Sequence, residues 1–143
     1  MAALADADFQ RLLEFRDGLR RFLRWSEEQS TAVGLTPAQH QLLLAVRGHS
    51  GGKAPTVSDV ADHLLLRRHS VVGLVNRAMA AGLLTRTPDP DDQRLVRLEL
   101  TKLGERRLAQ LSALHLEELR RLAPSLRPVW QGLDSTGPRF DRL

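Results

Sequence analysis

The sequence predicts a mainly α (α+β) fold in which two short helices joined by a tight turn are followed by a two-stranded β-hairpin. Residues 56–81 carry apolar side chains at three- and four-residue steps, and this pattern is interrupted once, after Leu66. Residues 95–100 instead alternate between apolar and charged side chains. Long helical patterns lie on both sides, at residues 6–31 and 101–123. With 143 residues, 42% of them hydrophobic, the chain is long enough for a domain with a packed core.

The first predicted helix covers residues 6–31, and Gly34 ends it. Its apolar side chains recur at helical spacing: Phe9, Leu12, Leu13, Leu19, Phe22 and Leu23. A second helix follows, because Thr36 suits the N-cap, Pro37 suits the first turn and Gln39 completes a capping box. The apolar face of this second helix consists of Leu42, Leu43 and Val46.

A third helix begins at Thr56, which can cap it together with Asp59. After the turn, a fourth helix starts near Arg68 and stops at Gly82. The side chains expected to face inward are Val57, Val60, Ala61 and Leu64 from the third helix, and Val71, Leu74, Val75 and Ala78 from the fourth. On or near the opposite face of the fourth helix lie His69, Ser70, Gly73, Asn76 and Arg77.

Two strands are predicted at residues 83–87 and 95–100, joined by a turn-rich tip that protrudes. Thr101 then caps a long helix that ends near Ala123. A short final helix is expected from the spacing of Leu126, Val129, Trp130 and Leu133, and a flexible tail at residues 134–143.

The distribution of charge around the fourth helix favours a polyanionic partner. No Asp or Glu occurs from His63 to Pro88, a run of 26 residues that contains Arg67, Arg68, Arg77 and Arg86. An acid-free helix followed by a charged hairpin suits double-stranded DNA, which offers both a phosphate backbone and a groove.

Other classes of protein are disfavoured. No apolar run approaches the roughly 20 residues needed to span a bilayer, the N-terminus has no signal-peptide pattern, and cysteine is absent. We therefore expect a cytoplasmic protein. The five histidines show no metal-ligand spacing, no Ser, His or Asp sits in a catalytic motif, and no cofactor motif occurs. We expect neither an enzyme nor a resident metal or cofactor.

The two outer helical regions, residues 6–33 and 101–133, carry more apolar surface than a small DNA-reading unit could cover. A symmetric homodimer built from both ends of the chain would bury this surface.

The order helix, turn, helix and hairpin between two outer helices resembles the MarR family of bacterial transcriptional regulators. The residues that carry the resemblance are Val57 to Leu64, Arg68 to Ala81, Gly82-Leu83-Leu84-Thr85-Arg86, Asp92-Gln93-Arg94 and Leu98-Glu99-Leu100-Thr101-Lys102-Leu103-Gly104. The resemblance covers roughly residues 9–133, and the wing with its Leu-Thr-x-x-Gly exit is more specific than the helix-turn-helix alone.

This resemblance implies one MarR-like domain over residues 1–143, with a winged helix-turn-helix core at 36–100 and dimerisation helices at 6–33 and 101–133. It further implies a homodimer that binds a pseudo-palindromic operator, usually as a repressor. The recognition helices would enter major grooves and the wings the adjacent minor grooves. Small effectors, often phenolic or anionic, would change the spacing between the two reading heads. Many members have a polar or basic side chain where this chain has Gly73, so its sequence preference cannot be taken from the family.

The candidate DNA-binding residues are Arg67, Arg68, His69, Ser70, Gly73, Asn76, Arg77, Arg86, Asp92, Arg94 and Arg97. Arg94 at the wing tip suits a narrow minor groove, although it could instead only pair with a neighbouring aspartate. Asp92 would orient Arg94 or cap the turn. Arg77 could contact a phosphate or pair with Asp59.

The start of the fourth helix suits base and phosphate contacts, with a solvated basic helix end as the alternative. Asn76 could read an adenine or be a plain exposed side chain. Arg86 and Arg97 would anchor phosphates. Trp25 could line an effector pocket, although a core or dimer contact is the more ordinary role of a tryptophan. The alternative function is a winged-helix module that binds a protein partner and little or no DNA.

Overall fold

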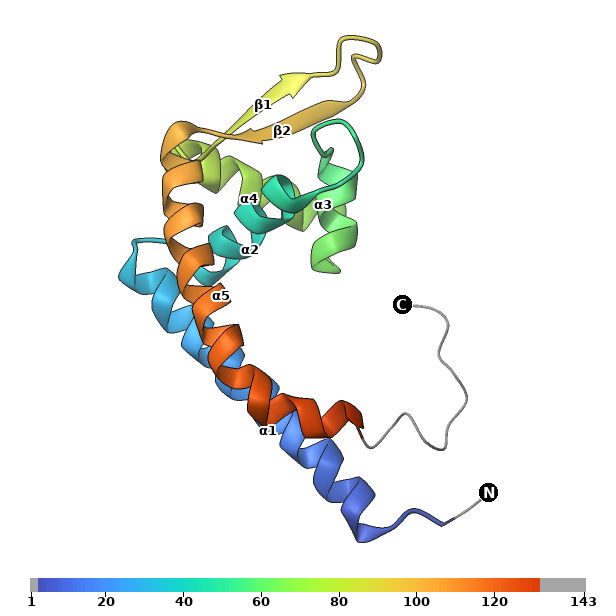
Figure 1. Cartoon of the computed structure of the whole chain (residues 1–143). Coiled ribbons are helices and arrows are strands. Elements are labelled where there is room, and N and C mark those ends of the chain that lie inside the picture. The colour runs from blue at the N-terminus through green and yellow to red at the C-terminus, as the bar shows by residue number, and fades with distance from the viewer. Residues whose placement is uncertain (1–2, 132–143) are drawn as a thin grey trace. The chain divides into compact units, whose positions relative to one another are not determined.

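The computed structural model describes residues 3–131, which form five helices and one two-stranded antiparallel sheet (Figure 1). The elements are α1 (Asp6–Ala32), α2 (Pro37–Gly48), α3 (Val57–Leu64), α4 (Arg68–Ala80), β1 (Leu84–Pro88), β2 (Val96–Leu100) and α5 (Lys102–Gln131). The chain divides into two compact units. Among the described residues, unit 1 comprises 3–26 and 114–131, and unit 2 comprises 27–113.

Capping boxes fix where α2 and α3 begin. The Gln39 amide donates to Thr36 Oγ1 at 3.1 Å and the Thr36 amide donates to Gln39 Oε1 at 3.0 Å. The same reciprocal pair joins Thr56 and Asp59, at 3.2 and 2.9 Å. Both N-terminal signals in the sequence are therefore confirmed, and each supplies partners for backbone N–H groups that a helix start leaves open.

The turn between α3 and α4 contains a leucine in the left-handed region of backbone space. Leu65 has φ 55° and ψ 41°, and its amide donates to the carbonyl of Ala61. The Leu65 side chain is 91% exposed, so it meets no packing constraint in this conformation. Gly82, with φ +73°, follows the end of α4, as predicted.

The hairpin pairs β1 with β2 in a register that joins Leu84 to Leu100 and Pro88 to Val96. The predicted strands are confirmed within one residue. The structure adds a link that local sequence patterns did not indicate: Arg97 forms an isolated bridge with Thr56, and the Leu98 amide donates to the carbonyl of Pro55 at 2.9 Å. The segment before α3 therefore lies along the outer edge of β2.

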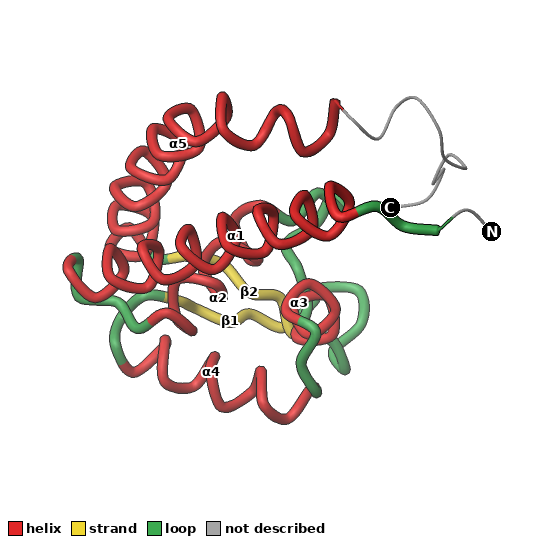
Figure 2. Tube along the Cα trace, turned by 90° about the horizontal axis from the view of Figure 1, so that it is seen from below, coloured by secondary structure: helices red, strands yellow, loops and turns green. Residues whose placement is uncertain are grey.

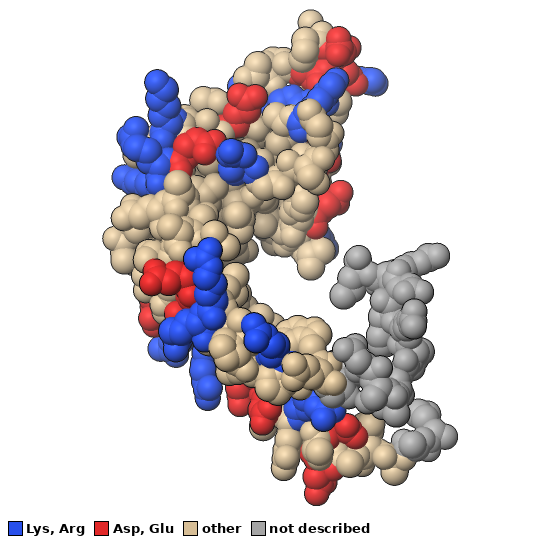
Figure 3. Space-filling view, in the orientation of Figure 1, with Lys and Arg blue, Asp and Glu red and all other residues tan. Residues whose placement is uncertain are grey.

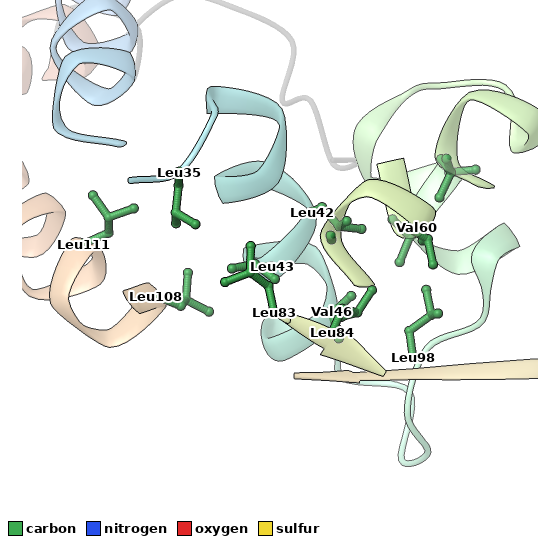
Figure 4. Close-up of a cluster of buried hydrophobic side chains, with 14 residues drawn as sticks. Leu35, Leu42, Leu43, Val46, Val60, Leu83, Leu84, Leu98, Leu108 and Leu111 are labelled. Atoms are coloured by element: carbon green, nitrogen blue, oxygen red, sulfur yellow. The ribbon is translucent and has the colours of Figure 1, made fainter. Parts of the chain in front are cut away.

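A single hydrophobic core holds unit 2 together (Figure 4). Fourteen buried side chains contribute to it: Leu35, Leu42, Leu43, Val46, Val60, Ala61, Val71, Val75, Ala78, Leu83, Leu84, Leu98, Leu108 and Leu111. The start of α5 approaches the hairpin so closely that a Cβ on Gly104 would lie 2.2 Å from the carbonyl oxygen of Leu83. Thr101 secures this junction by donating from its hydroxyl to the carbonyl of Gly82.

The prediction of two separate helices at the C-terminal end was wrong. Helix α5 continues through Pro124 and Pro128 to Gln131. Leu122, Leu126 and Val129 keep helical spacing across both prolines, and Val129 is buried, so packing of this stripe outweighs the loss of backbone hydrogen bonds. Leu133 and the tail predicted at residues 134–143 lie outside the described residues.

Unit 1 consists of the first part of α1 and the last part of α5, which run antiparallel. Phe15 packs edge-on against Trp130 with ring centroids 5.7 Å apart, and a Cβ on Gly18 would lie 3.4 Å from Leu126 Cδ2. The contacts leave many apolar side chains uncovered: Leu4, Phe9, Leu12, Leu13, Leu19, Leu23, Leu116, Leu119 and Trp130 are all between 44% and 65% exposed.

Candidate nucleic-acid interface

Helix α4 lies at the edge of unit 2, with α2, α3 and the hairpin to one side of it (Figure 2). Val71, Val75 and Ala78 face the core of unit 2, as predicted. The side chains of His69, Ser70, Val72, Asn76 and Arg77 are exposed, and Gly73 lies half-buried among them. No acidic side chain occurs on this helix. A helix held by one face and open on the other is the arrangement needed to enter a groove.

The N-terminal end of α4 is electropositive and lacks a side-chain cap. Arg67 occupies the N-cap position with extended backbone and makes no capping hydrogen bond. Arg68, His69 and Ser70, in the first turn, are exposed. Backbone N–H groups of an uncapped first turn can donate to a phosphate, and the helix dipole favours an anion there.

A pocket of about 180 Å³ separates the N-terminal half of α4 from the hairpin and the start of α3. Arg68 on α4 and Arg86 on β1 both line it, together with the exposed Val72 and the polar Ser58. The structure thus brings together two of the predicted basic residues that lie 18 positions apart in sequence. Two guanidinium groups beside hydroxyl and apolar surface suit a sugar-phosphate backbone.

The wing tip carries an arginine held by an aspartate. Asp92 accepts from Arg94 Nε at 3.0 Å and from Nη2 at 3.1 Å, and it also accepts from the Arg94 backbone amide at 3.1 Å. The Arg94 side chain is 90% exposed. These hydrogen bonds, the side-chain ones first, hold the pKa of Asp92 below its usual value. Acidic and basic side chains therefore gather together at the free end of the hairpin (Figure 3).

Arg97 lies in a different environment from the one expected of a phosphate anchor. Its Nε donates to Asp89 Oδ2 at 2.8 Å and its Nη1 donates to the carbonyl of Ala54 at 2.9 Å, and only 20% of the side chain is exposed. Asp89 also accepts from the amides of Asp91 and Asp92. The Arg97 hydrogen bond, followed by these two, lowers the pKa of Asp89 to about 2. Arg97 therefore ties the base of the wing to the segment before α3.

The pairing of Arg77 with Asp59, one of the alternatives raised from the sequence, does not occur. Asp59 bonds to Thr56, whose backbone amide is the main reason that the pKa of Asp59 is lowered, and it lies 3.8 Å from His49 Nε2. Arg77 makes no ion pair with any residue that the structure describes. It remains available on the open side of α4.

Trp25, the candidate effector residue, lies in an aromatic cluster of unit 1. Its ring centroid is 4.9 Å from that of His115 and 6.0 Å from that of Phe22. Ser26 Oγ lies 2.6 Å from His115 Nε2 and positions the imidazole. The cluster offers an aromatic surface beside a polar pair.

The histidine and acidic side chains of residues 3–131 were expected to bind no metal, and their arrangement is as follows. They contain no group of three or more His, Asp or Glu side chains arranged to hold an ion. One histidine contact was not foreseen: His49 Nδ1 lies 2.9 Å from His63 Nε2, although 14 residues separate them in sequence. Within the same described range, no helix has the length and apolar character that a bilayer-spanning segment needs.

Comparison with known proteins identifies a related protein family. Residues 33–95 match the sequence model of the MarR family. Comparison with curated proteins gave no significant match.

Solved structures with the same fold include a mutant of Staphylococcus aureus MepR bound to an oligodeoxyribonucleotide, with a TM-score of 0.64 and 20% identity over 77% of this chain and 79% of that one. CouR from Rhodococcus jostii RHA1, bound to p-coumaroyl-CoA, gives a TM-score of 0.68 and 22% identity over 96% and 100%. A mutant of MarR from E. coli gives 0.66 and 20% over 93% and 98%. At these identities the similarity establishes a shared winged helix fold.

Proposed function

Because residues 33–95 match the sequence model of the MarR family, we propose that the chain is a homodimeric transcriptional repressor of this family that binds a pseudo-palindromic operator in double-stranded DNA. The observation that carries the proposal is the open, acid-free side of α4 beside a wing that presents Arg94. The protein acts by binding and performs no chemistry, and it works in the cytoplasm.

Base readout falls to the open side of α4. His69, Ser70 and Asn76 carry hydrogen-bonding groups on this side, and all three are exposed. An α-helix fits the major groove of B-DNA, where each base pair presents a distinct pattern of donors and acceptors. Asn76 has the amide geometry that can bond an adenine at two points.

Arg68, Arg86 and Arg94 would contact the phosphate backbone and the minor groove of the DNA. Arg68 and Arg86 line the pocket beside α4, where they would hold one phosphate between the helix and the wing. Arg94 would enter the adjacent minor groove, whose negative potential attracts guanidinium groups. Asp92 preorganises Arg94 in the free protein. Arg94 could exchange Asp92 for the groove by a local change, because its side chain is 90% exposed.

A second copy of the chain would cover the exposed apolar side chains of unit 1. Two copies related by a twofold axis present two α4 helices to two half-sites, which explains why an operator would be pseudo-palindromic. The aromatic cluster at Trp25 and His115 is the place where a small aromatic or anionic effector would bind. CouR, a structure of the same fold, holds an aromatic acyl-CoA.

The wing arginine gives a sharp test of the proposal. Arg94→Ala should weaken binding to a selected operator duplex while the dimer remains intact. Arg47→Ala is the matched control, because Arg47 is also exposed and paired with a carboxylate, Glu105, but lies outside α4 and the wing. Equal affinity of wild type and Arg94→Ala in a fluorescence-anisotropy titration would remove Arg94 from the interface. Binding of wild type to duplex no tighter than to heparin would favour a protein-interaction module instead.

A further inference from the structure

The side chain of Arg77 lies over Gly73, one turn earlier in α4. A Cβ placed on Gly73 would lie 3.4 Å from Arg77 Nη1, 3.8 Å from Nη2 and 3.9 Å from Cζ. Side chains of a helix lean toward its N-terminus, so residue i+4 covers the surface above residue i. The guanidinium therefore occupies the space next to the Gly73 α-carbon.

This position brings the charge of Arg77 to the middle of the open side of α4. Val71, Val75 and Ala78 mark the buried side. At about 100° per residue, Gly73 lies nearly opposite that side, whereas the α-carbon of Arg77 lies toward the flank. An arginine that pointed straight out from position 77 would face the edge of a groove. By lying across Gly73 it would instead face the floor of a groove that received this side of α4.

The guanidinium has its donors available for a ligand. Arg77 forms no ion pair with a residue in the described part of the chain, and no acid occurs between His63 and Pro88. A guanidinium carries five N–H donors in a planar fork. Nη1 is the guanidinium atom nearest the glycine, and the Arg77 residue is exposed.

We propose that Arg77, seated across Gly73, reads one guanine in each half-site of the operator. This inference rests on the proposed function and adds the base and the residue that reads it. A guanidinium that faces the floor of the major groove can donate to both O6 and N7 of guanine, an acceptor pair that no other base presents. The glycine is then the feature that makes room for the arginine, and residue 77 supplies the side chain that position 73 lacks.

The test is a selection from a randomised duplex library with wild type, Arg77→Ala and Arg77→Lys, followed by anisotropy titrations with single-base variants of the selected duplex. Wild type should select a guanine at one position in each half-site. Both variants should lose preference at that position by about 5- to 150-fold and keep it at the others. Lysine retains the charge but lacks the fork, so it separates base reading from simple charge.

Substitutions of Gly73 test the seat itself. Gly73→Leu should remove the same guanine preference because its side chain takes the space of the guanidinium. Gly73→Ala gives the graded comparison: its methyl group would only reach van der Waals contact with Arg77 at 3.4 Å, so it should remove less of the preference than Gly73→Leu does. Circular dichroism should show that both remain folded, because each replaces glycine inside a helix.

Two results would overturn the inference. Arg77→Ala could weaken binding to every duplex equally and reduce the salt slope by about one, which would make Arg77 a phosphate anchor. It could also select the same guanine as wild type, which would assign the reading to another residue. Failure of wild type to select any sequence would instead overturn the proposed function, and this inference with it.

Discussion

Unit 1 and unit 2 bury their apolar residues to very different extents. Unit 2 encloses fourteen hydrophobic side chains in one core, whereas among the described residues of unit 1 only Val129 is buried. Nine large apolar side chains of unit 1 are instead exposed, against four in unit 2: Leu44, Leu65, Leu66 and Val72. Exposed large apolar side chains in such number are typical of an interaction surface. Unit 2 has the core of an independently folding domain, and unit 1 has the surface of an incomplete one.

Placing charges on the exposed apolar side chains of unit 1 should have the largest effect. Leu12→Glu with Leu23→Glu should convert the proposed dimer to a monomer, because each copy would bring two carboxylates into the proposed interface. Operator affinity should then fall by about 10²- to 10⁴-fold, as the two half-sites are no longer bound together. Sedimentation velocity measures the mass. Leu65→Glu is the control, an exposed leucine of unit 2 whose replacement should leave the mass unchanged.

Core truncation in unit 2 should have the next largest effect. Leu98 is fully buried, and Leu98→Ala should lower the free energy of unfolding by about 2–5 kcal/mol at every protein concentration. Leu13→Ala in unit 1 removes a side chain that is 58% exposed in one copy, so its effect should depend on protein concentration. Urea unfolding at several concentrations distinguishes the two. A concentration-dependent loss for Leu98→Ala would mean that unit 2 also needs a partner.

Replacing a glycine by alanine should also destabilise unit 2 more than unit 1, but by a smaller amount. Gly104→Ala should lower the free energy of unfolding by about 1–3 kcal/mol, because the methyl group meets the Leu83 carbonyl. Gly18→Ala in unit 1 should be neutral or stabilising by up to about 1 kcal/mol, since its methyl group would only touch Leu126. Thermal melts of both variants check this. A stabilised Gly104→Ala protein would show that the junction of hairpin and α5 is looser than described.

The smallest expected effect is on how the stability of the protein declines at acidic pH. Asp89 has a folded-state pKa of about 2, below its ordinary value of 3.8, so the stability it contributes is complete above pH 3.8 and is lost as pH falls toward 2. Arg97→Gln should remove the main cause of that shift, lower the melting temperature at pH 7 and flatten its decline with acid. Glu118 of unit 1, whose pKa is lowered by its hydrogen bonds to Arg121, is the surface counterpart. Melts of Arg97→Gln and Arg121→Gln from pH 7 to pH 2 compare them. Identical acid profiles for wild type and Arg97→Gln would contradict the role given to this pair.

Local signals in the sequence predicted the elements of unit 2 well. The Thr36–Gln39 and Thr56–Asp59 boxes each lie within four residues, and Gly82 acts at its own position, so their consequences can be read directly. The end of α5 was predicted wrongly because the contacts at its last turns, Leu126 beside Gly18 and Trp130 against Phe15, involve the other helix of unit 1, which local sequence patterns do not reveal.

The sequence predicts which surface forms the candidate interface, but it does not predict the side-chain contacts within that surface. The acid-free run and the wing motif identify the residues of α4 and the hairpin. They do not indicate that Arg97 reaches the Ala54 carbonyl, 43 residues earlier, because that contact depends on how the segment before α3 meets β2. The spacing of four residues between Gly73 and Arg77 is enough to predict that the Arg77 side chain covers Gly73. A glycine on this face nevertheless suggests at first that a base contact has been lost.

The most direct test of DNA binding is a fluorescence-anisotropy titration of the duplex upstream of the protein's own gene, over a salt series, with scrambled duplex as competitor. We expect tight binding that resists the competitor and falls by about 10³- to 10⁵-fold between 50 and 200 mM salt, as for six to ten phosphate contacts. Should binding to both duplexes, and to those from a genome-wide selection, be equally weak, α4 and the wing would not form an operator-reading surface.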